Sequence, residues 1–230
     1  MIKTSLNTAL LATTLLAAVS ANAVTIVSWD LAGEPGNQVS TSPTAVAPGI
    51  TGLDLTRGAG LTPSAAGNSI SASGWTAQAT DYFSLGFTAA PGVSVNLESL
   101  FIGTRSSATG PGSLGLFYSV DSFASPLFTF NQAPGTNFVN TVVDLTALPD
   151  VTGAVEFRVS ALGTTAANGS PTGTGGTTRL TAYFVGGNFD RDLQFTGTVN
   201  TATTVIPLPA AGWMLLSGLA ALGFTSRRKP

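Results

Sequence analysis

Residues 155–161 read VEFRVSA, in which apolar and polar side chains alternate at every step. A period of two is typical of a β-strand that is buried on one face only. Residues 114–120 (LGLFYSV) place their larger apolar side chains on one face in the same way. Further candidate strands, each bounded by Gly, Pro, Asn or Ser, are residues 24–29, 82–87, 93–102, 127–130, 138–145, 179–185 and 193–199. About nine short strands separated by turn residues predict an all-β fold, an antiparallel β-sandwich or jelly-roll-like body.

Two stretches rich in Gly, Pro, Ser and Thr interrupt these strands. Residues 33–74 predict long loops with one or two edge strands, and residues 168–178 predict a flexible surface loop. No stretch of the body has the 3.6-residue period of a long amphipathic helix. The body is therefore expected to consist of strands and loops.

Histidine and cysteine are both absent from the 230 residues. Their absence excludes Ser-His-Asp and Cys-His catalysis, disulfides, zinc sites and haem or iron–sulfur ligation. Paired carboxylates can still hydrolyse glycosides, but the sequence pairs none of Glu34, Glu98 and Glu156 with an aspartate. Glu156 is spaced from Arg158 as a charge pair on the outward face of a strand. The sequence therefore predicts that the protein is not an enzyme.

The charges of the body disfavour nucleic acid and anionic lipid as partners. Residues 24–205 contain five arginines, no lysine and eleven acidic residues, which gives a net charge of −6. Nucleic acids and anionic lipid surfaces are bound through basic patches. We therefore expect no nucleic-acid partner and no peripheral binding to anionic lipid.

The N-terminus has the order of features found in a secretory signal peptide. A lysine precedes the short apolar stretch of residues 10–19, and Ala21 and Ala23 supply the small-x-small pattern that signal peptidase cleaves. Residues 1–23 are therefore predicted to be a signal helix that engages the Sec machinery and is then removed. The alternative is an ordinary first helix of the fold.

The C-terminus carries a second signal. Two prolines keep residues 206–209 out of a helix interior, and an uncharged run of about 15–17 residues follows, at or just below the length that spans a bilayer core. Three cations then end the chain, and they favour a cytoplasmic tail with the body outside. The pattern predicts a single transmembrane helix; the alternative is a buried apolar helix of a soluble domain.

The run IPLPAAGWMLLSGLAALGFTSRRK, residues 206–229, resembles the C-terminal sorting signal of PEP-CTERM proteins. It is most similar to the VPLPA-CTERM variant, with Ile206 where that name has valine. The residues that carry the resemblance are Pro207, Leu208, Pro209, Ala210, Trp213, Arg227, Arg228 and Lys229. The resemblance implies that an exosortase, a membrane-embedded transpeptidase-like protease, cuts near the Pro-Leu-Pro region in an exporter that makes exopolysaccharide. It also implies an inner-membrane precursor that faces the periplasm, and a processed form at the cell surface or in the extracellular matrix.

The body itself resembles a recurrent secreted sandwich of PEP-CTERM proteins. The resemblance lies in residues 28–30 (SWD), 55–61 (LTRGAGL) and 186–192 (GGNFDRD). It supports the sandwich and implies no activity.

Asn188, Asp190 and Asp192 are oxygen ligands spaced by two residues in a glycine-flanked segment. Ca²⁺ takes six to eight such ligands, so the segment is a candidate calcium site; no other cofactor is expected. The alternative is a surface turn in which Asp190 bonds to the backbone and Arg191 is solvated.

Trp75 lies in a loop-rich stretch, SGWT, and is the candidate for carbohydrate contact. An aromatic face can stack on a sugar ring, whereas the alternative is core packing, since buried aromatic side chains supply the largest apolar area. Trp29, at the end of a candidate strand, is expected in the core.

Three segments follow from these observations: a signal peptide (1–23), a β-sandwich body (24–205) and a sorting signal with a transmembrane helix and basic tail (206–230). The leading hypothesis is an exported, non-enzymatic cell-envelope or extracellular-matrix protein that an exosortase handles. The alternative is a secreted carbohydrate-binding module, with or without calcium, whose partner is the exopolysaccharide.

Overall fold

The computed structural model describes residues 23–134, 138–185 and 188–202. These residues form strands and loops, with one short 3₁₀ helix, η1 (Ser119–Asp121). The all-β prediction is confirmed for the body. The predicted signal peptide up to residue 22 and the whole predicted sorting signal lie outside the described residues.

The chain divides into two units, residues 1–200 and 201–230. Only Thr201 and Ala202 of the second unit are described, and everything below concerns the first. Within the described residues, no helix is both long enough and apolar enough to span a membrane.

Nine strands of the described part form the first sheet. Their order is β2-β7-β14-β9-β17-β1-β3, with β12 paired to β9 and β6 paired to β7. Where the register is described, the pairs are antiparallel except for β2, which is parallel to β7. The bounds are β1 Val24–Trp29, β2 Pro35–Gly36, β3 Ala45–Val46, β6 Thr62–Pro63, β7 Ser69–Ser73, β9 Val93–Ser106, β12 Val139–Asp144, β14 Thr178–Thr181 and β17 Leu193–Thr201.

Six other strands of the described part form the second sheet, in the order β11-β10-β13-β8-β4, with β5 paired to β8. All of these pairs are antiparallel. The bounds are β4 Ile50–Gly52, β5 Thr56–Arg57, β8 Tyr82–Ala89, β10 Ser113–Tyr118, β11 Phe128–Asn131 and β13 Ala154–Ala161. A separate hairpin joins β15 (Tyr183–Val185) to β16 (Asn188–Arg191).

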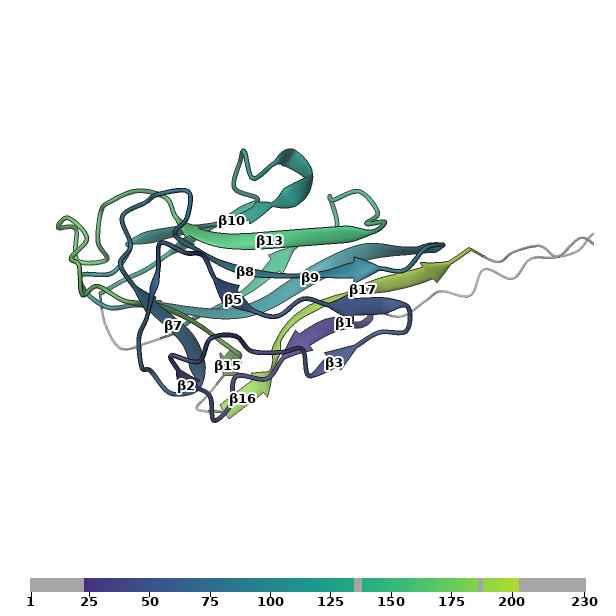
Figure 1. The fold of residues 1–230 in the computed structure, drawn as a ribbon, viewed down its shortest axis with the longest axis horizontal. Helices are drawn as coiled ribbons and strands as arrows, with labels where there is room; N and C mark the ends of the chain where they lie inside the picture. The colour runs from purple at the N-terminus through teal and green to yellow at the C-terminus, as the bar shows by residue number, and fades with distance from the viewer. Residues whose placement is uncertain (1–22, 135–137, 186–187, 203–230) are drawn as a thin grey trace, which may run out of the picture. The chain divides into compact units, whose positions relative to one another are not determined.

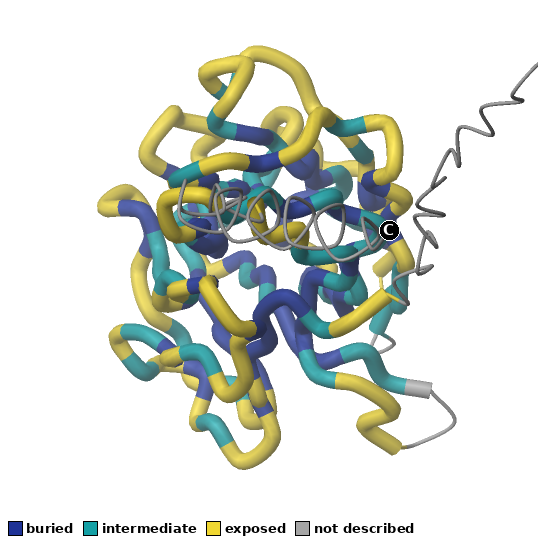
Figure 2. Tube along the Cα trace, turned by 90° about the vertical axis from the view of Figure 1, so that its right-hand side faces the viewer, coloured by how far each residue is buried: buried dark blue, intermediate teal, exposed yellow. Residues whose placement is uncertain are grey.

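The two sheets pack face to face as a β-sandwich, with β10 and β13 in one layer and β1 and β17 in the other (Figure 1). Phe195 of the first sheet lies 4.7 Å from Phe157 and 6.2 Å from Phe87 of the second, measured between ring centroids. Trp29 is fully buried 6.2 Å from Phe195, which confirms its predicted place in the core. Figure 2 shows buried segments inside and exposed loops around them.

The prediction for residues 33–74 was incomplete. This stretch forms six short strands, β2 to β7, and β7 lies inside the first sheet between β2 and β14. The sequence of β7, SISAS, is too polar to resemble an inner strand, yet its first four residues are buried. Contacts with β2, β6 and β14, which no local pattern records, bury it.

Two further boundaries differ from the predictions. Residues 179–185 divide between β14 of the first sheet and β15 of the hairpin, with the buried Ala182 between them. Residues 188–191, for which a surface turn was the alternative to a calcium site, form strand β16. The other predicted strands are present to within a few residues.

Candidate functional site

The outer face of the second sheet carries a half-buried polar row. In β8 the side chains of Phe83 and Leu85 point into the core, so Tyr82 and Ser84 face outward. The same alternation in β13 turns Glu156 and Arg158 outward. Arg158 is directly opposite Ser84 on β8 and Phe117 on β10.

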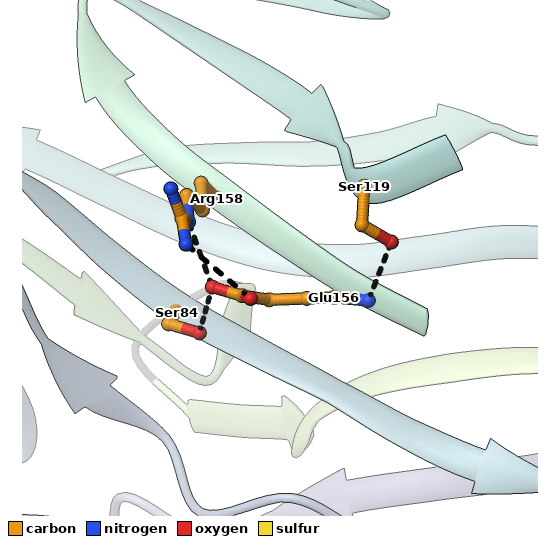
Figure 3. A network of polar contacts seen from close by, with 4 residues as sticks. All are labelled: Ser84, Ser119, Glu156 and Arg158. Carbon is orange, nitrogen blue, oxygen red and sulfur yellow. Dashed lines mark hydrogen bonds and ion pairs between the residues drawn. The ribbon is translucent and has the colours of Figure 1, made fainter. Parts of the chain in front are cut away.

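Glu156 and Arg158 form an ion pair, with 2.7 Å between Arg158 Nε and Glu156 Oε1 (Figure 3). Ser84 Oγ donates a second hydrogen bond to the same carboxylate oxygen at 2.8 Å, and the backbone N–H of Glu156 donates to Ser119 Oγ at 3.0 Å. The sequence predicted this pair as a surface charge pair. The structure confirms its outward direction and adds that both side chains are half-buried and fixed by neighbours.

Two aromatic rings lie against the Arg158 guanidinium. Its central carbon is 4.1 Å from the ring centroid of Tyr82 and 3.9 Å from that of Phe123. Both distances are within the range of cation–π attraction. The ion pair with Glu156 and the two rings together fix the position of the guanidinium on the sheet.

The loop after β10 places Phe123 over the sheet. Ser122 and Phe123 both have φ near +60°, and the Phe123 N–H donates to the Tyr118 carbonyl at 3.0 Å. Asp121 accepts hydrogen bonds from the next turn of this loop, from the N–H groups of Ala124 and Ser125, at 3.2 Å each. The loop is therefore organised to present Phe123.

A second loop, residues 76–81, is organised by Asp81, which is only 1% exposed. Its Oδ2 accepts hydrogen bonds from the Thr76 N–H, the Thr76 hydroxyl and the Gln78 N–H at 2.7–3.1 Å. Burial raises the pKa of this carboxyl, but the hydrogen bonds from Thr76, Gln78 and Thr80 outweigh burial and hold the pKa below its ordinary value. Asp81 is therefore an ionised anchor of the loop.

Between the two loops lies a groove of about 440 Å³, which we call the outer-sheet groove. The residues that line it are Ala77, Gln78, Ala79, Phe117, Ser122, Phe123, Arg158, Ser160 and Ala161. Three of these, Ala77, Ser122 and Phe123, have φ of about +60°, a conformation that non-glycine residues adopt at a cost of about 1–3 kcal/mol. Strained backbone of this kind gathers at binding and catalytic sites.

The predicted carbohydrate contact, Trp75, lies away from this groove. Its ring packs 5.5 Å from Phe83, its indole N–H donates to the Ala72 carbonyl, and 3% of the residue is exposed. Trp75 borders a separate pocket of about 310 Å³ formed with Pro171 and Thr172. In this conformation the indole packs as a core residue, and stacking of a sugar on it stays a prediction.

The predicted calcium ligands have separate surroundings in the structure. Asn188 and Asp190 are exposed on β16, and Asp190 lies 3.8 Å from Arg191. Asp192 instead accepts a hydrogen bond from Ser28 on β1 at 3.1 Å. In the part of the chain that the structure describes, no three acidic residues are arranged to hold a metal ion. Calcium binding stays a prediction.

Of the predicted signal-peptide cleavage site and sorting signal, the structure describes one residue, Ala23. Ala23 is exposed and directly precedes β1, which begins at the predicted first residue of the mature chain. Ala21 and all the sorting-signal residues from Pro207 to Lys229 lie outside the described residues.

Sequence reasoning missed the groove. One available signal was the outward position of Tyr82 on a strand beside the strand of Glu156 and Arg158. No periodicity points to Phe123 or Gln78, because each lies in a loop, and the local hydrogen bonds of a loop do not indicate which strand it covers.

The comparisons with known proteins establish no family. No family model matches the sequence, and no curated protein matches it. Solved structures of carbohydrate-binding module family 29 are similar: one is 14% identical with a TM-score of 0.38, covering 76% of this chain and 90% of that one. A mutant module complexed with mannohexaose is 13% identical with a TM-score of 0.37, covering 77% and 92% of the two chains. Another mutant, complexed with cellulohexaose, is 14% identical with a TM-score of 0.36, covering 76% and 90%. These values are too low to establish a common fold, so the function proposed below is argued from the residues of this chain.

Proposed function

We propose that this protein is a non-catalytic, exported polysaccharide-binding protein, and that the outer-sheet groove receives the sugar. The observation that carries the proposal is the groove itself, in which Phe117, Phe123 and the fixed Arg158 surround an open space on an exposed sheet face. Sugar rings present C–H faces that pack on aromatic rings and hydroxyls that bond to planar polar groups.

The ring of Phe117 is positioned as a stacking surface. Ring atoms of Phe117 occupy the space beside Gly115, where a Cβ would lie only 2.8 Å from the ring. The glycine thus lets the ring lie close over β10. Around it, Gln78, Ser122 and Ser160 supply hydrogen-bonding groups.

The charge of the groove favours neutral sugar units. Arg158 is balanced by Glu156, and the groove lining contains no other charged side chain. The Glu156 carboxylate already serves as the partner of Arg158 and Ser84. We therefore assign it a role in fixing the site, in place of the proton transfer that a glycosidase requires.

Replacing Phe123 with alanine is expected to weaken binding of a neutral polysaccharide about tenfold, because the change removes one stacking face and uncovers Arg158. The measurement is affinity electrophoresis of the full chain, kept in a detergent without sugar headgroups. The gels contain galactomannan, hydroxyethyl cellulose or the exopolysaccharide of the producing organism.

Phe189→Ala is the matched control, since Phe189 is a phenylalanine that is 41% exposed on the separate hairpin. It should bind like the parent. The proposal fails if the parent is retarded by none of the three polysaccharides, or if Phe123→Ala and the parent are retarded equally.

We propose further that the chain is delivered by its signal peptide and sorted by an exosortase at its C-terminus, as the resemblance of residues 206–229 implies. The apolar run and the basic tail support an inner-membrane precursor with its body outside. A polysaccharide-binding body suits the exopolysaccharide that accompanies such systems.

Deletion of residues 206–230 is expected to move the protein from the membrane and cell surface into the soluble periplasmic or secreted pool, because the deletion removes the only predicted anchor of the mature chain. Fractionation of producing cells with an antibody to the body measures this. Unchanged membrane retention of the truncated chain would contradict the sorting proposal and leave the binding proposal intact.

A further inference from the structure

The outer face of the first sheet brings two arginines together. Arg179 of β14 is directly opposite Arg105 of β9 on one side and Ser71 of β7 on the other. Directly opposite residues of antiparallel strands project to the same face. Their neighbours Leu180 and Ile70 are buried in the core, so this row faces outward.

Both guanidinium groups lie over one aromatic ring. The central carbon of Arg105 is 5.6 Å from the ring centroid of Phe138, and that of Arg179 is 5.7 Å from it. Phe138 directly precedes β12, whose Val139 pairs with Thr104 of β9. Phe138 thus gathers the two cations at one point of the surface.

The pair is not balanced by acidic residues in the described part of the chain. The ion pairs found there are Arg158 with Glu156 and Arg191 with Asp190. Like charges directly opposite each other destabilise a sheet. The pKa of Arg179 is lowered, mainly because the side chain is partly buried and also because Arg105 is close to it. In a body of net charge −6, this face concentrates positive charge that a bound anion would offset.

A buried hydroxyl belongs to the same row. Ser71 is fully buried, and its Oγ has no hydrogen-bond partner among the described residues. Unpaired buried polar atoms of this kind are rare. Because Ser71 is inaccessible to solvent, Arg105 and Arg179 are the members of this row that a polysaccharide could contact.

We propose that Arg105 and Arg179 form a second binding site, which takes the oxyanion groups of an acidic polysaccharide, uronate carboxylates or sulfate esters. Guanidinium groups bind such planar or tetrahedral oxyanions by paired, charge-assisted hydrogen bonds. The site rests on the proposed polysaccharide binding, but it lies on the outer face of the opposite sheet from the groove. One molecule can then contact a neutral segment on one face and acidic substituents on the other.

The test measures binding of the full chain, in a non-ionic detergent without sugar headgroups, to polygalacturonate, to dextran sulfate and to neutral dextran. The parent is expected to bind at least one polyanion, with an affinity that falls as NaCl rises from about 50 to about 200 mM. Arg179→Gln is expected to bind that polyanion about tenfold more weakly, because it loses one charge-assisted contact. Neutral dextran should not compete.

Arg191→Gln is the matched control, because Arg191 lies over Phe101 on the same sheet and is already paired with Asp190. It should stay within about threefold of the parent. Folding is checked by thermal unfolding without ligand, in which Arg179→Gln should resemble the parent; added polyanion should raise the Tm of the parent by more than that of Arg179→Gln. Absence of polyanion binding by the parent, or equal binding by parent and Arg179→Gln, overturns the inference.

The two proposals fail separately. Phe123→Ala should retain the polyanion binding of the parent, because the polyanion site is on the first sheet and Phe123 lines the groove on the second. If the parent binds a neutral polysaccharide but no polyanion, only the arginine site is overturned. If it binds a polyanion but no neutral polysaccharide, only the groove is overturned. The preferred probe, polygalacturonate or dextran sulfate, identifies carboxylate or sulfate as the recognised group.

Discussion

Replacing Arg57 with methionine is expected to lower the free energy of unfolding by about 3 kcal/mol or more. Arg57 lies on β5 of the second sheet, but its guanidinium reaches the first sheet. Its Nε donates to the Ser71 carbonyl at 2.9 Å, Nη1 to the Gln38 carbonyl at 2.6 Å, and Nη2 to the Gly36 carbonyl. One side chain therefore ties β2 and β7 to the other layer.

The size of the expected loss follows from what methionine leaves behind. It matches the length of the aliphatic stem and supplies no donor, so half-buried carbonyls lose charge-assisted hydrogen bonds that water does not fully replace. Burial lowers the pKa of Arg57, but an arginine stays protonated at neutral pH. Thermal unfolding of the full chain, followed by tryptophan fluorescence, should show a Tm lower by about 6–12 °C for a domain of this size.

Two variants control this measurement. Arg57→Lys keeps the charge but not the planar fork of donors, so its stability should lie between those of the parent and Arg57→Met. Arg191→Met removes an exposed arginine and should cost no more than about 1 kcal/mol. If Arg57→Met unfolds within a degree or two of the parent, the link between the layers contributes little and the assignment is wrong.

The strands of the sandwich were predictable because their signal is local. The alternation at 155–161 and at 82–87 reports directly which side chains face the core, and both strands form as expected. Strand β7 was not predictable as an inner strand. Its burial depends on a parallel partner some 30 residues away along the chain and on the Arg57 side chain.

Both candidate sites depend on pairings that periodicity does not encode. Alternation indicates that Arg105 and Arg179 face outward, but only the register of β14 against β9 makes them direct neighbours. In the groove, Arg158 was read correctly as outward-facing. The approach of Phe123 depends on two residues with positive φ in a loop that carries no glycine at those positions. The hydrogen bonds within this loop join residues only three to five apart, but they do not by themselves fix where the loop lies on the sheet.

Replacing Asp81 with alanine is expected to lower the free energy of unfolding by about 2–4 kcal/mol, because three hydrogen bonds to one buried carboxylate oxygen are lost together. The loop that Asp81 anchors forms one wall of the outer-sheet groove, so binding of neutral polysaccharide should weaken as well. The space around the carboxylate is tight, since a Cβ at Gly60 would collide with it. Asp150→Ala removes an exposed aspartate and is expected to change stability by less than about 0.5 kcal/mol.

The contribution of Asp81 should also depend on pH. Its folded pKa is lowered, so ionised Asp81 stabilises the fold fully above about pH 4, the ordinary pKa of an aspartate. That stabilisation is lost as the pH falls through the lowered folded pKa. Asp81→Asn keeps the shape of the side chain and cannot ionise, so it isolates this effect.

Urea unfolding of the parent and Asp81→Asn, measured from pH 7 down to about pH 2, gives the difference in their free energies of unfolding. The parent should be the more stable by about 1 kcal/mol at neutral pH. The difference should stay constant down to about pH 4 and then shrink, because the unfolded parent binds a proton at Asp81 before the folded parent does, whereas Asp81→Asn has no proton to bind there. A difference that is unchanged between pH 7 and pH 2, or that grows on acidification, would mean that the Asp81 carboxylate does not anchor the loop as an anion.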